Sequence, residues 1–281
     1  IEAELQKVDN SLSPFNKTSI ISRINRNEKV KVDEMFSEVF QLAEKISGDT
    51  DGAFDITVAP MVNAWGFGFK TGNPPTRQTI DSLRAIVGFH TVSLQDGYVI
   101  KKNPKTMLDC SAIAKGYGTD VVARFLKKKG VQNFMVEIGG EIVVNGNSEK
   151  LQPWRIGINK PTDDSLNTNQ AIQDVVSVSN IAMATSGNYR NFYYKNGKKY
   201  AHTIDPKTGY PVQHNILSAT VFADDCATAD AYATSFMVLG LDGAKKILEK
   251  HPELCAYLIY SDQKGSNQIW YSPSLQKKLG K

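Results

Sequence analysis

Three segments of the chain place reactive or ligating side chains next to glycine and other small residues. The first runs from Leu108 to Gly118 and contains Asp109 and Lys115. Asp109 ends an apolar stretch that predicts a strand, and the small residues after it open a predicted helix. A strand-to-helix turn of small residues lets a ligand approach free backbone N–H groups. The alternative, a packing turn in which Asp109 caps the helix, stays open.

The second segment, His202–Pro211, carries a histidine at the end of a predicted strand. An Asp-Pro pair and a Gly-x-Pro pattern after it predict an ordered turn. Histidine exchanges protons near neutral pH, so His202 is a candidate general base. A purely structural hydrogen-bonding role for this side chain is the alternative.

The third segment, Ala227–Phe236, is a predicted helix of mostly small residues. Asp230 and Thr234 are four residues apart, so they share one face of that helix and both present oxygen. A carboxylate and a hydroxyl suit a hard cation such as Mg²⁺. In the alternative interpretation, the Thr234 hydroxyl bonds back into its own helix beside a solvated Asp230.

Several common catalytic signatures are missing from the sequence. No P-loop pattern occurs, the glycines between Gly66 and Gly72 miss the dinucleotide-binding spacing by one residue, and no H-E-x-x-H occurs. The four histidines do not cluster. Cys110, Cys226 and Cys255 show neither a disulfide framework nor a zinc-ligand spacing. A zinc hydrolase is therefore disfavoured.

Length and composition describe an ordinary globular protein. The chain has 281 residues, 41% of them hydrophobic and 22% charged, which allows one large domain or two closely joined lobes. Its net charge of +4 comes from 33 basic and 29 acidic residues that are well mixed, so we expect no nucleic-acid partner. No apolar run approaches the length of a membrane span. Attraction for phosphorylated small molecules stays possible.

Periodicity predicts alternating helices and strand pairs. Helices are expected at 1–13, 30–46, 112–129, 227–239 and 242–251, with Gly48 and Gly130 as stops. A hairpin is expected around Asp96-Gly97, and further strands at 134–138, 141–145, 154–158, 175–178, 199–203, 217–222 and 256–260. The fold class is α+β, with mixed or antiparallel sheets flanked by helices. The polar stretch Lys160–Gln170 is too short for a domain linker.

Taken together, the segments resemble the ApbE family of FAD:protein FMN transferases. The resemblance extends from Ser11 to about Leu241 and rests on seven motifs that stand in the family's order. These are Leu12-Ser13-Pro14-Phe15-Asn16-Lys17-Thr18-Ser19 with Ile24-Asn25; Gly52-Ala53-Phe54-Asp55-Ile56-Thr57 with Asn63-Ala64-Trp65-Gly66-Phe67-Gly68; Asp109 with Ala114-Lys115-Gly116-Tyr117; Gly139-Gly140-Glu141-Ile142; Ser186-Gly187-Asn188-Tyr189; His202-Thr203-Ile204-Asp205-Pro206-Lys207-Thr208-Gly209; and Ala229-Asp230-Ala231-Tyr232-Ala233-Thr234.

The resemblance implies roles for matching positions. Phe15 corresponds to an aromatic residue that lies against the flavin. The other implied FAD-binding positions are Ala53, Phe54, Asp55, Asp109, Lys115 and the backbone near Ile204. The implied Mg²⁺ ligands are the Ala112 carbonyl, Asp230, Thr234 and the carbonyl of Ala233. His202 matches the histidine implicated in catalysis.

The implied reaction moves FMN from the substrate FAD to a Thr or Ser hydroxyl of an acceptor flavoprotein, with Mg²⁺ as cofactor and AMP as leaving group. The implied acceptor is a subunit of a redox complex, on the periplasmic or outer-surface side of a bacterial membrane. Any membrane contact is expected through a lipid anchor outside this chain. We expect one ApbE-like domain over residues 1–281 that lacks the family's first strand and one flavin contact on it. Cys110 stands where the family often has Leu or Val.

Two other functions use the same motifs. A Mg²⁺-dependent FAD pyrophosphatase would arise if water replaced the acceptor hydroxyl, giving FMN and AMP. A non-catalytic flavin-binding protein is the alternative from a different class, although the presence of Asp230, Thr234 and His202 favours an enzyme.

Overall fold

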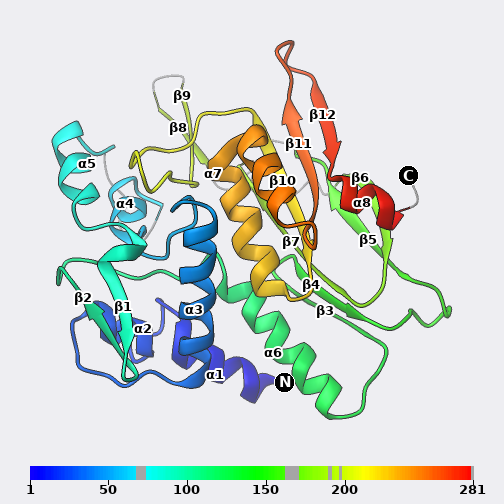
Figure 1. Ribbon diagram of the computed structural model, residues 1–281, viewed down its shortest axis with the longest axis horizontal. Helices are drawn as coiled ribbons and strands as arrows, with labels where there is room; N and C mark the ends of the chain where they lie inside the picture. Colours follow the sequence, from blue (N-terminus) through cyan, green and yellow to red (C-terminus); the bar gives the residue numbers. More distant parts are fainter. Residues whose placement is uncertain (68–73, 162–170, 189–191, 196–197, 280–281) are drawn as a thin grey trace. The chain divides into compact units, whose positions relative to one another are not determined.

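The computed structural model describes residues 1–67, 74–161, 171–188, 192–195 and 198–279, with the backbone alone for 192–195 and 198–199 (Figure 1). The chain divides into two compact units. Unit 1 contains Ile1–Ala114 and His202–Val212, and unit 2 contains Lys115–Ala201 and Gln213–Lys281. Each unit is therefore built from two separate stretches of sequence. The predicted α+β class is confirmed, and of the predicted mixed or antiparallel sheets the described strands form antiparallel ones.

Unit 1 is mainly helical. It contains α1 (Glu2–Leu12), α2 (Ile20–Asn25), α3 (Glu34–Asp49), α4 (Ala59–Ala64), α5 (Arg77–Arg84) and the short 3₁₀ helix η1 (Phe89–Thr91). The N-cap of α3 is Asp33, whose Oδ1 accepts the Phe36 amide at 2.8 Å and the Ser11 hydroxyl at 2.8 Å. Asp33 explains why α3 starts at Glu34 rather than at the predicted Val30. Gly48, the predicted stop, lies inside the helix.

The predicted hairpin is present in unit 1. Strand β1 (Val92–Gln95) pairs antiparallel with β2 (Tyr98–Lys101), and Gln95 faces Tyr98. The two turn residues, Asp96 and Gly97, have φ values of 52° and 79°. Positive φ at both central positions is the type I′ geometry that the right-handed twist of the strands favours.

Unit 2 is organised around a six-stranded antiparallel sheet with the order β12-β11-β10-β7-β4-β3 (Figure 1). Its members are β3 (Phe134–Ile138), β4 (Glu141–Asn145), β7 (Ile181–Gly187), β10 (Ile216–Ala223), β11 (Cys255–Ser261) and β12 (Asn267–Tyr271). Two further pairs are β5 (Trp154–Asn159) with β6 (Ile172–Val178), and β8 (Phe192–Lys195) with β9 (Lys198–Ala201). The predicted strands at 134–138 and 141–145 are confirmed residue by residue.

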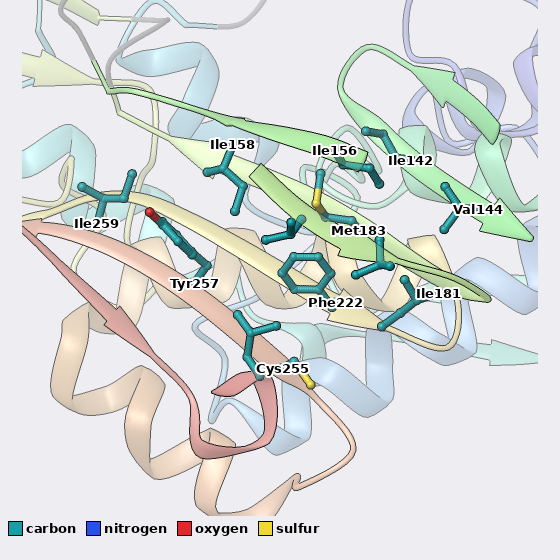
Figure 2. Close-up of a cluster of buried hydrophobic side chains, with 13 residues drawn as sticks. Ile142, Val144, Ile156, Ile158, Ile181, Met183, Phe222, Cys255, Tyr257 and Ile259 are labelled. Atoms are coloured by element: carbon teal, nitrogen blue, oxygen red, sulfur yellow. The ribbon is translucent and has the colours of Figure 1, made fainter. Parts of the chain in front are cut away.

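The two faces of this sheet bury different side chains. One face forms an apolar cluster with β5, β6 and α8 (Pro273–Leu279), and its members include Ile142, Val144 and Met183 (Figure 2). The intervening Val143 and Ala182 belong to a second cluster, on the opposite face. This alternation follows from the two-residue period of a strand. The second face packs against α6 (Ala114–Lys128) and α7 (Cys226–Lys250).

The backbones of helices α6 and α7 are in direct contact at one point. A Cβ atom added to Gly116 of α6 would lie 2.3 Å from the carbonyl oxygen of Cys226, the first residue of α7. Glycine is therefore the one residue type that fits there. Helix α7 joins the two helices predicted at 227–239 and 242–251, and it kinks between them at Gly240, where φ is 73° and ψ is 178°. The predicted separation is thus present as a kink.

Among the helices of the described residues, none is long and apolar enough to cross a membrane.

The close approach of α6 and α7 predicts opposite outcomes for two glycine substitutions. Gly116→Ala should lower the free energy of unfolding by about 3 kcal/mol or more, because the added methyl meets rigid backbone. Gly48→Ala is the control, since nothing lies within 4 Å of its added Cβ. It should be neutral or stabilising by about 0.5 kcal/mol, because alanine favours the helix. Urea unfolding followed by circular dichroism measures both, and equal stabilities would contradict the close approach.

Candidate functional site

The residues singled out from the sequence fall in both units, and each group is described within its own unit. Unit 1 contains Phe15, Ala53, Phe54, Asp55, Asp109, Ala112, His202 and Ile204. Unit 2 contains Lys115, Asp230, Ala233 and Thr234.

Phe15 lies on a tightly bonded loop between α1 and α2. Asn16 donates to Asp9 Oδ2 at 2.7 Å, and its side-chain oxygen accepts the Thr18 amide at 3.0 Å. The Ser19 hydroxyl donates to the Ser13 carbonyl at 2.7 Å and closes the loop. Phe15 is nevertheless 77% exposed. A large aromatic side chain held on an ordered loop but left exposed can offer its face to a flat ring.

The Ala53–Asp55 segment is buried, and the Asp55 carboxylate is fully engaged inside unit 1. Its Oδ1 accepts the amide of Thr57 at 2.8 Å and the hydroxyl of Thr57 at 2.6 Å. Its Oδ2 accepts the amide of Phe89 at 2.7 Å. Burial raises the pKa of Asp55, and these hydrogen bonds oppose the rise. The side chain therefore joins two loops of the unit, so a ligand would meet this segment through its backbone.

Asp109 and Ala112 lie in the turn that leads into α6. The Asp109 amide donates to the Ile56 carbonyl at 2.7 Å, and Asp109 Oδ1 accepts the amide of Ser111 at 2.8 Å. The helix begins at Ala114, two residues later than predicted. Asp109 thus stabilises the turn before the helix rather than serving as the helix cap, while Ala112 stays a predicted carbonyl ligand.

His202 directly follows β9 and opens the predicted turn. In unit 1 its ring makes an edge contact with Phe67, with ring centroids 6.4 Å apart. The turn is held by the Gly209 amide, which donates to the Asp205 carbonyl at 2.8 Å, and by a bridge between Ile204 and Pro211. The Trp65 indole N–H also donates to the Gly209 carbonyl at 2.7 Å. The prediction of an ordered turn at a strand end is confirmed.

In unit 2, Asp230 and Thr234 lie one turn apart on α7. Asp230 is 4% exposed, and its Oδ2 accepts the amide of Gly116 at 3.1 Å. Gly116 is in the first turn of α6, where backbone amides have no partner within their own helix. Asp230 therefore caps α6 from a neighbouring helix. Ala233, next to Thr234, is completely buried.

Sequence reasoning missed Glu141 as a candidate site residue. It follows the Gly139-Gly140 turn as the first residue of β4 and is 1% exposed. One of its oxygens, Oε1, forms an ion pair with Lys115 Nζ, whereas Oε2 is buried without a hydrogen-bond partner among the described residues. The Gly-Gly-Glu motif marked the turn, but its partner is 26 residues away in the sequence.

Asp120 of α6 was also missed. Its two carboxylate oxygens accept the amides of Cys226 at 2.8 Å and Ala227 at 2.9 Å, at the start of α7. Burial raises the pKa of Asp120 to about 7, although these two hydrogen bonds oppose the rise. With both oxygens occupied, Asp120 has a structural role and fixes the N-terminus of the helix that carries Asp230.

The charges around Lys115 leave unit 2 with an excess of buried carboxylate. Burial, and then the charge of Asp230, raises the pKa of Glu141 to about 7. Burial also raises the pKa of Asp230, against the attraction of Lys115 and the hydrogen bond from Gly116. One ammonium, on a side chain that is 48% exposed, therefore balances two buried carboxylates. The donor set fits a bound cation, which would remove the cost of the uncompensated charge.

Within the described residues, no three His, Cys, Asp or Glu side chains group in a way that could hold a metal. The predicted ligand set has a single carboxylate, so a cluster of that kind is not required by it. Parts of other sequence motifs, namely Gly68 to Gly72, Tyr189 and most of the polar stretch 160–170, lie outside the described residues.

Comparisons with known proteins agree with the fold. The chain is similar to a solved structure titled flavin transferase ApbE from Vibrio cholerae, with a TM-score of 0.88 and 35% identity over 98% of this chain and 88% of that one. It is similar to an apo flavinyl transferase ApbE from Pseudomonas stutzeri, with a TM-score of 0.88 and 30% identity over 100% of this chain and 87% of that one. Fold and sequence thus define a transferase.

The sequence comparisons specify the family. The model of the ApbE family matches residues 1–259. A Haemophilus influenzae protein named FAD:protein FMN transferase is 40% identical over 99% of this chain and 82% of its own length. An Escherichia coli protein of the same name is 34% identical over 99% of this chain and 80% of its own length. The chain belongs to the ApbE family, which confirms the resemblance and the expectation of an enzyme.

The hydrogen bonds of Asp55 predict a loss of stability on substitution, whether or not FAD is bound. Asp55→Asn should lower the free energy of unfolding by about 2 kcal/mol, because an amide cannot accept on both sides. Asp51→Asn is the matched control: its side chain is 93% exposed, and asparagine tolerates its positive φ of 51°. It should change stability by less than about 0.5 kcal/mol. Urea unfolding without FAD measures both variants. An unfolding midpoint of Asp55→Asn equal to that of the wild type would contradict the structural role of Asp55.

Proposed function

We propose that the chain transfers the FMN moiety of FAD to a Thr or Ser hydroxyl of an acceptor flavoprotein and releases AMP. The observation that carries this proposal is the similarity to enzymes named FAD:protein FMN transferase along 99% of the chain. We further propose that the acceptor belongs to a redox complex on the periplasmic or outer-surface side of a bacterial membrane. That part rests on the family resemblance.

Residues of unit 1 are the proposed contacts for the isoalloxazine ring. Phe15 supports this role through its exposure on a closed, hydrogen-bonded loop. The Ala53–Asp55 segment is proposed to contact the ring through its backbone, because the Asp55 carboxylate is already hydrogen-bonded within the unit. Asp109 and the backbone near Ile204 are proposed FAD contacts from the same unit. In unit 2, Lys115 is the proposed positive charge for the pyrophosphate.

Asp230 and Thr234 are the proposed side-chain ligands of Mg²⁺, joined by the carbonyls of Ala112 and Ala233. Support comes from the buried Asp230 carboxylate, its raised pKa and the excess of negative charge beside it. When bound, Mg²⁺ supplies positive charge that stabilises the phosphate oxygens of FAD and of the leaving AMP. Asp230 is also tied to the Gly116 amide, so its position is set before any substrate arrives.

His202 is the proposed general base. The acceptor hydroxyl oxygen forms a new bond to the FMN phosphorus, the bond from that phosphorus to the AMP oxygen breaks, and the hydroxyl proton passes to the His202 ring. An unactivated hydroxyl is a poor nucleophile at neutral pH, which is why a base is needed. The bonded turn after His202 limits the motion of its backbone.

Product analysis tests the proposed reaction. The chain is incubated with FAD and Mg²⁺, with and without a flavoprotein subunit of a bacterial redox complex. Transfer predicts ultraviolet fluorescence that stays on the denatured acceptor, together with one AMP per flavin attached. Free FMN and AMP at the same rate with and without acceptor would show a pyrophosphatase instead. FAD binding without AMP release would show a non-catalytic flavin-binding protein.

Asp230→Asn should reduce transfer to the level of wild-type enzyme treated with EDTA. The amide oxygen can still accept the Gly116 N–H, so the variant isolates the loss of negative charge from loss of the cap. Asp242→Asn is the matched control, because Asp242 is an exposed acid on the same helix. Its transfer rate should equal that of the wild type. If Asp230→Asn retained the wild-type dependence of rate on Mg²⁺ concentration, Asp230 would not be a ligand.

His202→Ala should slow transfer by roughly 10²–10⁴-fold, the usual contribution of a general base, with FAD still bound. His90→Ala serves as the control, since His90 is an exposed histidine of the same unit. Single-turnover rates at saturating FAD, together with FAD titrations by flavin fluorescence, separate chemistry from binding. A variant that binds FAD poorly but turns over normally at saturation would make His202 a binding residue.

A further inference from the structure

Glu141 is a buried acid that is only partly paired, and nothing in the packing of the strand requires an acid at this position. The side chain is buried, Oε1 pairs with Lys115, and Oε2 has no hydrogen-bond partner among the described residues. Leaving a buried charged oxygen without a partner costs free energy that an apolar residue at the same place would avoid. A residue kept at such a cost is a candidate for function.

Lys115 has two carboxylates that compete for its ammonium. Burial lowers the pKa of Lys115, but the charges of Asp230 and Glu141 raise it by more. The backbone of Lys115 lies beside Asp230, because the amide of the next residue, Gly116, donates to Asp230 Oδ2. Among the described residues, however, the ion pair of Lys115 within 4 Å is with Glu141. A flexible four-carbon side chain has other rotamers that reach a neighbouring carboxylate.

We propose that Glu141 is a positioning residue that holds the Lys115 ammonium away from Asp230 and so leaves the Asp230 carboxylate available to a divalent cation. The inference rests on the proposed Mg²⁺ site. An ammonium that paired with Asp230 would occupy the oxygen that the cation needs, and the two positive charges would repel each other. Glu141 removes that competitor and still keeps the lysine close enough to meet a phosphate.

The backbone around Glu141 is suited to a fixed counter-ion. Ile138 and Glu141 face each other across a two-residue turn, in which Gly139 and Gly140 have φ values of 65° and 103°. A Cβ atom on Gly139 would lie 3.4 Å from Glu141 Oε2 and 3.5 Å from Lys115 Cδ. Both distances are ordinary van der Waals contacts, so the turn packs directly against the ion pair, and it is the positive φ that favours glycine at position 139. The paired strands fix the carboxylate end of the ion pair.

Binding of Mn²⁺ to the full chain without FAD tests the inference independently of activity. Free Mn²⁺ is measured by electron paramagnetic resonance during titration of the wild type, Glu141→Gln, Glu141→Asp, Lys115→Met and Glu141→Gln with Lys115→Met. Glu141→Gln should weaken Mn²⁺ binding by about 10-fold. Glu141→Asp keeps the charge but withdraws it from Lys115, and it should also weaken binding. Lys115→Met should change little alone and restore binding in the Glu141→Gln background, to within about 3-fold of wild type.

Three outcomes would overturn the proposal. Unchanged Mn²⁺ affinity in Glu141→Gln would mean that Lys115 does not compete for Asp230. Wild-type affinity in Glu141→Asp would mean that Glu141 acts through its charge alone. If Lys115→Met raised Mn²⁺ affinity equally in the wild-type and Glu141→Gln backgrounds, Lys115 and Glu141 would act independently on the site. Circular dichroism shows whether each variant is folded. If Glu141→Gln does not fold, Glu141→Asp still tests the proposal.

Failure of the metal site itself gives a different pattern. Asp230→Asn should abolish Mn²⁺ binding whatever residue occupies position 141. Binding that persists in Asp230→Asn would overturn the proposed metal site. Binding that is lost in Asp230→Asn but unaffected by every change at Glu141 and Lys115 would overturn the present inference and leave the metal site standing.

Discussion

Helices α6 and α7 cap each other, and the buried charges of unit 2 depend on that contact. Asp230 of α7 accepts the Gly116 amide in the first turn of α6, and Asp120 of α6 accepts the Cys226 and Ala227 amides in the first turn of α7. Each helix thus supplies the carboxylate that the other needs at its positive end. The exchange requires contact between the two backbones, which only a glycine at position 116 permits.

Reciprocal capping also explains why carboxylates are buried in this part of the chain. Both carboxylate oxygens of Asp120 accept hydrogen bonds from backbone amides, so its role is structural. Asp230 is bonded to an amide through Oδ2, and its charge also acts on Lys115 and Glu141. Asp120 therefore only fixes the contact between the helices, whereas Asp230 also links that contact to the charges of Lys115 and Glu141. The same architecture that stabilises the helices buries the Asp230 carboxylate, the proposed metal ligand, in a region of low dielectric, where its attraction for a cation would be strong.

The sequence predicted elements well where the local pattern and the tertiary environment agree. The β3–β4 hairpin was predicted to the residue because its branched side chains flank two glycines. Strand β7, at the centre of the sheet, was missed: Ala182 and Ala184 are small because helices pack on that face, and small residues carry little strand signal. The helix start at Glu34 depended on Asp33, which caps α3 and also accepts a hydrogen bond from Ser11, 22 residues away.

Candidate site residues could be proposed from the sequence where a motif contains the reactive group, and were missed where the partner is distant. Asp230 and His202 stand in their own motifs, so residue type and spacing were sufficient to propose them. Glu141 depends on Lys115 and Asp230, and Asp120 depends on the start of α7; no pattern within one segment reveals either relation. Asp55 shows the converse. Its motif predicts a ligand-binding segment, yet its carboxylate holds two loops together, so a residue within such a motif can support the backbone as readily as it can contact a ligand.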